Sequence, residues 1–196
     1  KMKYLVLLGI LCAVLPSAEA KKWEIKVWSG NSVSKDNRFT EAFNKSTDGD
    51  ILELQNDITV NADAELKLTP KQTSKKVTVT SKEGNTFRII NYGESYGVKI
   101  KAGTTLGMSN VTYDCDGYPQ IEDVFNLEAQ NGEKVARMIL EDGATICNAH
   151  MRTYYNYENA VIHIKRGAVF TMRPGSAILN CKNESSPGKG GAICCD

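Results

Sequence analysis

Two short acidic segments hold the residues that could most readily do chemistry. Asp114–Gly117 and Glu141–Gly143 each place two acidic side chains close to a glycine. Paired carboxylates can act as general acid and base on a glycan, and carboxylate oxygens can also bind calcium. Asp-Gly is equally the usual composition of a tight turn. We therefore interpret both segments as turns, and we expect no catalytic residue, no metal site and no cofactor.

Basic residues form a second candidate group. The run His163–Arg166 is similar to the basic strand motif of polygalacturonases, although the paired aspartates and the Gly-His-Gly element of that family are missing. Lys99 and Lys101 alternate with apolar residues in the same way as His163 and Lys165, which would place all four side chains on one face of a sheet. We expect a solvated basic stripe there rather than an active site.

A third group is aromatic and lies where the chain loses its alternation of apolar and polar residues. The segment Ala149–Tyr157 contains Arg152, Tyr154, Tyr155 and Tyr157. We expect this segment to form an exposed loop. Because aromatic side chains supply contact area at a low entropic cost, these four residues are the expected binding residues. Their partner would be an unknown host or cell-surface ligand, either a protein or a glycan.

The elements that must position these residues repeat along the chain. The segment Met138–Asn148 recurs thirty-two residues later as Phe170–Asn180. Such a period is typical of a solenoid, and short alternating runs broken by Gly, Asn and Pro indicate strands and turns. The sequence therefore predicts an all-β fold, a right-handed parallel β-helix of about four to five coils. Asn148 and Asn180 should stack at one turn. The expected inward columns are Leu106, Met138 and Phe170, and Met108, Leu140 and Met172.

The first twenty residues have the features of a targeting segment. Lys1 and Lys3 give a positive start, Tyr4–Leu15 is an apolar run, and Ala18–Ala20 has the small-x-small pattern of a cleavage site. A run of about a dozen apolar residues is short for a helix that spans a bilayer. We expect residues 1–20 to be a signal peptide. The mature chain, which has no further long apolar run, is expected to be secreted or cell-surface.

The segment 21–50 is expected to cover the open end of the solenoid. Lys22–Trp28 alternates as a strand does, and Asp36–Lys45 carries Phe39, Ala42 and Phe43 on one side of a short helix. A strand and a helix at this place would cover the core and the unpaired backbone that the first coil exposes. The coils are then expected to fill residues 51–196 and to stop within a coil, as in a truncated chain.

The cysteines could form one disulfide between adjacent coils, and at least one thiol is left over. Five follow the signal segment: Cys115, Cys147, Cys181, Cys194 and Cys195. Cys115 and Cys147 are thirty-two residues apart, so they could lie on adjacent coils about 4.8 Å apart and form a disulfide. Cys194 shares the repeat position of Ile162 and is expected in the core. Cys195 is expected to face outward as a free or intermolecular thiol, since an odd number of cysteines leaves one without a partner in the chain.

The C-terminal part of the chain resembles a known repeat. Ile178–Asn183, a spacer rich in Ser, Pro and Gly, and then Gly190–Ile193 resemble the GGAI-type repeat of polymorphic outer-membrane proteins and related adhesin-like right-handed β-helices. The segment Phe39–Ile58 is similar to the start of many such exported domains. The resemblance implies an exported or cell-surface protein that acts as an adhesin-like binding or spacer module.

Composition argues against some partners and leaves one alternative function open. The formal net charge is +1, from 24 basic and 23 acidic side chains without long blocks of either sign. We therefore expect no binding to nucleic acid or to an anionic membrane. Parallel β-helices also include pectin-degrading enzymes, so a polysaccharide lyase or hydrolase is the alternative. The two hypotheses differ in whether acidic side chains from adjacent coils converge in a groove.

Overall fold

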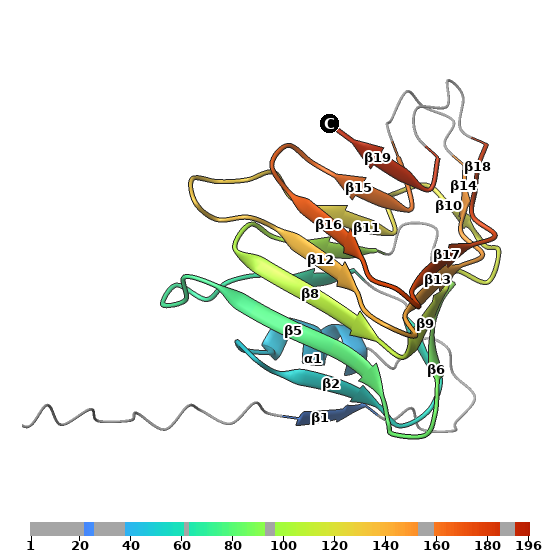
Figure 1. Ribbon diagram of the computed structural model, residues 1–196, viewed down its shortest axis with the longest axis horizontal. Helices are drawn as coiled ribbons and strands as arrows, with labels where there is room; N and C mark the ends of the chain where they lie inside the picture. Colours follow the sequence, from blue (N-terminus) through green and yellow to red (C-terminus); the bar gives the residue numbers. More distant parts are fainter. Residues whose placement is uncertain (1–21, 26–37, 61–62, 93–96, 153–158, 185–190) are drawn as a thin grey trace, which may run out of the picture.

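The chain folds as a parallel β-helix, in which successive turns of the chain stack their strands on one another (Figure 1). The computed structural model describes residues 22–25, 38–60, 63–92, 97–152, 159–184 and 191–196. Neighbouring strands in its sheets run parallel. The predicted all-β class and the parallel β-helix are therefore confirmed. The expected signal peptide, residues 1–20, lies outside the described residues.

Each turn passes through three sheets, and the later turns add a short fourth sheet. Sheet A has six strands: β1 (Lys22–Ile25), β2 (Ile51–Leu54), β5 (Lys75–Ser81), β8 (Thr104–Ser109), β12 (Arg137–Leu140) and β16 (Val169–Met172). Sheet B has five: β3 (Ile58–Val60), β6 (Phe87–Asn91), β9 (Val111–Asp114), β13 (Thr145–Cys147) and β17 (Ala177–Leu179). Sheet C has five: β4 (Ala64–Leu66), β7 (Val98–Ile100), β11 (Phe125–Leu127), β15 (Ile162–Ile164) and β19 (Ile193–Cys195). Sheet D has three: β10 (Pro119–Gln120), β14 (His150–Met151) and β18 (Lys182–Asn183).

The core consists of apolar side chains that point inward from these sheets and stack from turn to turn. The register confirms the two predicted columns on sheet A: Leu106, Met138 and Phe170, and Met108, Leu140 and Met172. Met138 and Leu140 are fully buried because strands lie on both sides of them. Met172 is 42% exposed because β16 is the last strand of sheet A. Each turn thus buries its inner face only where another turn covers it.

Left-handed backbone conformations explain why the two copies of the repeat share Gly and Asn at the same places. Gly143 and Gly175 have φ angles of 70° and 83°, and Asn148 and Asn180 have φ angles of 57° and 53°. Glycine adopts this region without strain, and Asn tolerates it better than most other residues. The glycines turn the chain from sheet A into sheet B. The asparagines turn it out of sheet B.

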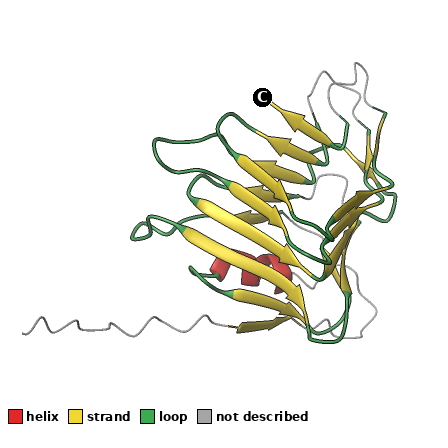
Figure 2. Ribbon diagram, in the orientation of Figure 1, coloured by secondary structure: helices red, strands yellow, loops and turns green. Residues whose placement is uncertain are grey.

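The N-terminal end of the solenoid is covered as the sequence predicts. β1 extends sheet A beyond β2, and the helix α1 (Arg38–Lys45) packs against β4 (Figure 2). Phe39 and Phe43 stack with 5.6 Å between their ring centroids and are buried together with Ala42. This burial matches the apolar side expected from their spacing. No helix among the described residues is long and apolar enough to cross a membrane.

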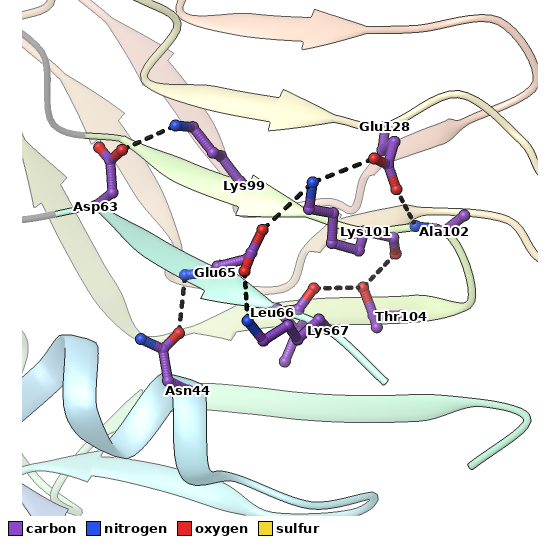
Figure 3. A network of polar contacts seen from close by, with 10 residues as sticks. All are labelled: Asn44, Asp63, Glu65, Leu66, Lys67, Lys99, Lys101, Ala102, Thr104 and Glu128. Atoms are coloured by element: carbon purple, nitrogen blue, oxygen red, sulfur yellow. Dashed lines mark hydrogen bonds and ion pairs between the residues drawn. The ribbon is translucent and has the colours of Figure 1, made fainter. Parts of the chain in front are cut away.

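The outer face of sheet C carries ion pairs rather than the predicted basic stripe (Figure 3). Lys99 Nζ lies 2.8 Å from the carboxylate of Asp63, and Lys101 Nζ lies 3.3 Å from that of Glu65 and 3.2 Å from that of Glu128. The hydrogen bond to Asp63 raises the pKa of Lys99, and the hydrogen bond to Glu128 raises the pKa of Lys101. The prediction of a solvated basic stripe is wrong because acids from neighbouring turns lie between the lysines.

The same network joins the N-terminal cap to the first turns. The amide oxygen of Asn44, near the end of α1, accepts a hydrogen bond of 3.0 Å from the backbone N–H of Glu65 (Figure 3). Glu65 in turn pairs with Lys101 on the next strand of sheet C. The helix is therefore connected to the stack by polar contacts as well as by its buried phenylalanines.

Candidate functional site

A polar depression lies at the corner where the chain leaves sheet B and enters sheet D, at the side of Figure 1 where β10, β14 and β18 are labelled. Its volume of about 410 Å³ is within the range of small-molecule sites. Its lining comes from three successive turns. The lining residues are Asp116, Gly117, Asn148, Ala149, His150, Asn180 and Lys182. We call this site the corner depression.

A ladder of hydrogen bonds fixes the polar groups in the corner depression. Asn180 Nδ2 donates to Asn148 Oδ1 at 3.4 Å, and Asn148 Nδ2 donates to Asp114 Oδ1 at 2.9 Å. The predicted stacking of Asn148 and Asn180 is therefore confirmed, and Asp114 of the preceding turn extends it. Asp116 shares the left-handed conformation, with a φ angle of 50°. Three consecutive turns thus leave sheet B through similar bends.

Asp114 is a structural residue of this corner. Its side chain is largely buried, and its Oδ1 also accepts a hydrogen bond of 2.8 Å from the backbone N–H of Asp116. Its Oδ2 lies 3.4 Å from Arg88 Nη1, while Arg88 Nε lies 2.9 Å from Asp57. The hydrogen bond to Asp57 and the charge of Asp114 both raise the pKa of Arg88. The carboxylate of Asp114 thus joins its own turn to the preceding turn through Arg88 and to the following turn through Asn148.

Both acidic segments contain the expected turns, although Asp114 itself is the last residue of β9. Asp116 and Gly117 form one turn, and Asp142 and Gly143 form the other. Glu141, beside the second turn, makes an ion pair of 2.8 Å with Arg173 of the following turn. Only Asp116 of these acids lines the corner depression.

The predicted binding loop begins later than expected. Ala149 and Met151 are fully buried, and His150–Met151 forms β14, which pairs with β10 and β18. The prediction of an exposed loop is therefore wrong for residues 149–151. These residues belong to the stack because β14 pairs with strands of the preceding and the following turn in sheet D. Arg152 is exposed at the end of β14, and its backbone N–H bonds Gln120 O at 2.8 Å.

The other three predicted binding residues, Tyr154, Tyr155 and Tyr157, lie outside the described residues. In the sequence they come after Arg152 and Thr153.

Charged groups of the last turn border the corner depression. His150 Nε2 lies 2.6 Å from Glu184 Oε2, and Lys182 Nζ donates to Glu184 Oε1 at 3.0 Å. The hydrogen bond from His150, and then that from Lys182, lowers the pKa of Glu184. The ionised carboxylate of Glu184 therefore orients the side chains of His150 and Lys182, which both line the depression. Sequence reasoning missed Lys182 and Glu184 because β18 has only two residues and shows no alternation.

The disulfide predicted between Cys115 and Cys147 is not formed, and both thiols are free. Cys147 is the register partner of Asp114, and the backbone N–H of Cys115 bonds Cys147 O at 3.0 Å. The register is shifted by one residue because Asn110 alone connects β8 to β9, whereas a longer turn connects β12 to β13. Burial raises the pKa of Cys147 to about 11 and raises that of Cys115 further. Neither thiol is activated as a nucleophile.

A second cluster of chemically capable side chains lies on the outer face of sheet C. His163 on β15 is the register partner of Cys194 on β19, and Ile164 is the partner of Cys195. The prediction that Cys194 shares the position of Ile162, and that Cys195 faces outward with His163, is therefore wrong by one residue. Ile162 pairs with Ile193 instead.

His163 is held by carboxylates on both sides of its ring. Its Nδ1 lies 3.1 Å from Asp123 Oδ2, and its Nε2 lies 2.8 Å from Asp196 Oδ1. Burial by itself would lower the pKa of His163, but the carboxylates of Asp196 and Asp123 together outweigh burial and raise it. The sequence contains a signal for this cluster. Cys194 lies on β19 and Asp196 follows it by two residues, so both should face the same side as their neighbour on β15.

Comparisons of the chain with protein-family models, with curated proteins and with solved structures found no match. The resemblance to the GGAI-type repeat therefore rests on the sequence segments that carry it. The side chains described above are the basis for inferring function.

Proposed function

We propose that this chain is an exported or cell-surface module of the adhesin-like β-helix type, similar to the repeats of polymorphic outer-membrane proteins. It binds a cell-surface glycan or protein through the corner depression and the connection that begins at Arg152. The observation that carries the proposal is the depression itself, a fixed polar surface built by three turns. In the sequence, Tyr154, Tyr155 and Tyr157 follow His150, a lining residue of the depression, by four to seven residues.

The chemistry of the corner depression suits a glycan. Asn148 and Asn180 present amides, His150 and Lys182 present donors, and Asp116 presents an acceptor. Because the ladder between the two asparagines already fixes their side chains, a ligand meets groups that lose little freedom on binding. Aromatic side chains beside such a surface would add apolar contact area. The polar depression would bind the hydroxyl groups of a sugar ring, and the tyrosines would contact its apolar face.

A polysaccharide lyase or hydrolase is the competing function. A two-carboxylate hydrolase places its acids roughly 5–9.5 Å apart on either side of the scissile bond. Asp116 is the one carboxylate in the lining of the corner depression, while Asp114 bonds Arg88 and Glu184 bonds His150 and Lys182. This arrangement favours binding over cleavage.

Binding and cleavage assays on the same variants test the proposal. The variant Tyr154→Ala/Tyr155→Ala/Tyr157→Ala and the variant Arg152→Ala are each expected to weaken adhesion to glycan-coated or cell surfaces by about tenfold or more, the loss expected for binding hot spots. Polygalacturonate and related acidic glycans should stay intact, with or without calcium.

Arg173→Ala is the matched control for this experiment. Arg173 is an exposed arginine paired with Glu141 between sheets A and B, away from the corner depression, and its loss should leave adhesion unchanged. Cleavage of an acidic glycan that is abolished by Asp116→Asn or Asp142→Asn would refute the binding-module proposal and support the lyase or hydrolase. Unchanged adhesion in both binding variants would also refute it.

A further inference from the structure

We propose that His163, Cys194 and Asp196 form a binding site for a divalent transition metal of the Zn²⁺ class, and that Asp123 holds the imidazole in position for it. This site is separate from the corner depression and does not depend on the proposed adhesion. It lies on the outer face of sheet C at the end where β15 and β19 run side by side (Figure 1).

The register of the sheet brings the three ligands together. His163 and Cys194 are direct partners on adjacent parallel strands, so their outward side chains are neighbours. Asp196 follows Cys194 by two residues, and its N–H bonds Ile164 O at 3.1 Å, which continues the ladder and keeps it on the same face. The Sγ of Cys194, a ring nitrogen of His163 and a carboxylate oxygen of Asp196 all lie within 4.8 Å of one another.

The geometry around His163 is that of a metal-ligating histidine with its orienting partner. A ligating imidazole usually donates its second ring N–H to a carboxylate, which fixes the tautomer and the ring plane. Asp123 Oδ2 lies 3.1 Å from Nδ1, while Nε2 lies 2.8 Å from Asp196 Oδ1. Asp123 is itself fixed, because Asn126 Nδ2 donates to its Oδ2 at 2.6 Å and the N–H of Ala160 donates to its Oδ1 at 2.9 Å.

The donor set selects the class of metal. One thiolate, one imidazole and one carboxylate match the borderline preference of Zn²⁺ and of Co²⁺, whereas Ca²⁺ and Mg²⁺ prefer oxygen ligands only. A tetrahedral ion with bonds of about 2.0–2.3 Å separates its ligand atoms by roughly 3.5 Å. Asp196 is 2.8 Å from His163 Nε2 and has a side chain exposed to 39%, so it can move outward by this small difference. Three protein ligands leave a fourth position open to water.

A protonated His163 between two aspartates is the alternative explanation of the cluster. In that arrangement the proton satisfies Asp123 and Asp196, and the arrangement does not require a ligand from Cys194. A metal requires the sulfur. The sulfur is within reach of such an ion, because it lies within 4.8 Å of the ligand atoms of His163 and Asp196. The two explanations therefore differ in what the removal of Cys194 changes.

Titration of the full chain with Co²⁺ and then Zn²⁺, in the presence of a non-chelating reductant at neutral pH, distinguishes them. We expect one Co²⁺ per chain with a near-ultraviolet sulfur-to-cobalt charge-transfer band, and displacement of the band by one equivalent of Zn²⁺. Cys194→Ser should abolish the band. His163→Ala should weaken binding at least tenfold, and Asp123→Asn, which changes a residue that positions the ligand, should weaken it about 10–100-fold.

Cys195→Ser is the matched control, since it removes a neighbouring thiol that faces the other side of β19, and the band should persist in it. Circular dichroism of each variant verifies that the β-sheet fold is retained. The site is refuted if the unaltered chain gives no stoichiometric band, or if the band survives Cys194→Ser. Loss of the band in Cys195→Ser but not in Cys194→Ser would equally refute it.

Discussion

Asn148 combines a backbone conformation with side-chain contacts that few other residues supply together. Its φ angle of 57° lies in the left-handed region, and its amide bonds Asp114 on one side and Asn180 on the other. The residue therefore both turns the chain and joins three successive turns at the corner depression.

Two substitutions of Asn148 should separate these contributions. Asn148→Gly keeps the left-handed conformation and loses the amide, so the free energy of unfolding should fall by about 1 kcal/mol. Asn148→Ala also loses the favourable conformation and should cost roughly 1 kcal/mol more. Urea denaturation of both variants measures the difference. Equal losses in the two variants would mean that the left-handed conformation contributes nothing to stability.

Single residues also show where sequence reasoning succeeds and where it stops. The stacking of Asn148 on Asn180 could be predicted because equal turn lengths precede both residues. The partners of Cys147 and Cys194 could not, because one connection in each case differs by one residue from the repeat. A shift of one residue reverses the face of a strand side chain. The position of Cys194 beside His163 was missed for this reason.

At the scale of elements, the connections between sheets hold the least predictable part of the fold. Sheet D consists of strands of two residues, too short to show alternation, and β14 falls within the segment predicted as a loop. The longer strands of sheet A, by contrast, alternate clearly and were predicted with the correct inward columns. The corner depression therefore lies where sequence patterns are weakest.

The turn between sheets A and B should depend on glycine at Gly175. Its φ angle is 83°, and a Cβ there would meet the carboxylate of Asp142 on the preceding turn. Gly175→Ala should therefore lower the free energy of unfolding by about 1–2 kcal/mol from the backbone alone, and more from displacing Asp142. Chemical denaturation measures this loss.

Two further glycines provide controls for Gly175→Ala. Gly84 has a φ angle of 78° but open space around its Cβ position, so Gly84→Ala should show only the backbone cost. Gly191 has neither constraint, and Gly191→Ala should change stability by less than about 0.5 kcal/mol. A loss in Gly191→Ala as large as in Gly175→Ala would contradict the explanation.

At the scale of the whole molecule, the fold could be predicted because the stacked turns of a solenoid produce a periodic sequence. Each turn must bury its inner face against the next, so inward positions recur with the repeat. The local sequence does not predict how much of the last turn of the solenoid is exposed. The exposure of the last turn became visible only in the structure, with Met172 and Leu179 exposed to 42% and 51%.

Two methionines at equivalent inward positions of sheet A test this nearest-neighbour view of stability. Met138 on β12 has strands on both sides and is fully buried, whereas Met172 on β16 has a neighbour on one side and is 42% exposed. Met138→Ala should lower the free energy of unfolding by about 2–5 kcal/mol, the usual cost of truncating a buried methionine. Met172→Ala should cost less than about 1 kcal/mol, because less of its surface is removed from water.

Equilibrium unfolding of both variants over a range of protein concentrations makes the comparison. A large, concentration-dependent loss in Met172→Ala would show instead that a second copy of the chain covers this end in solution.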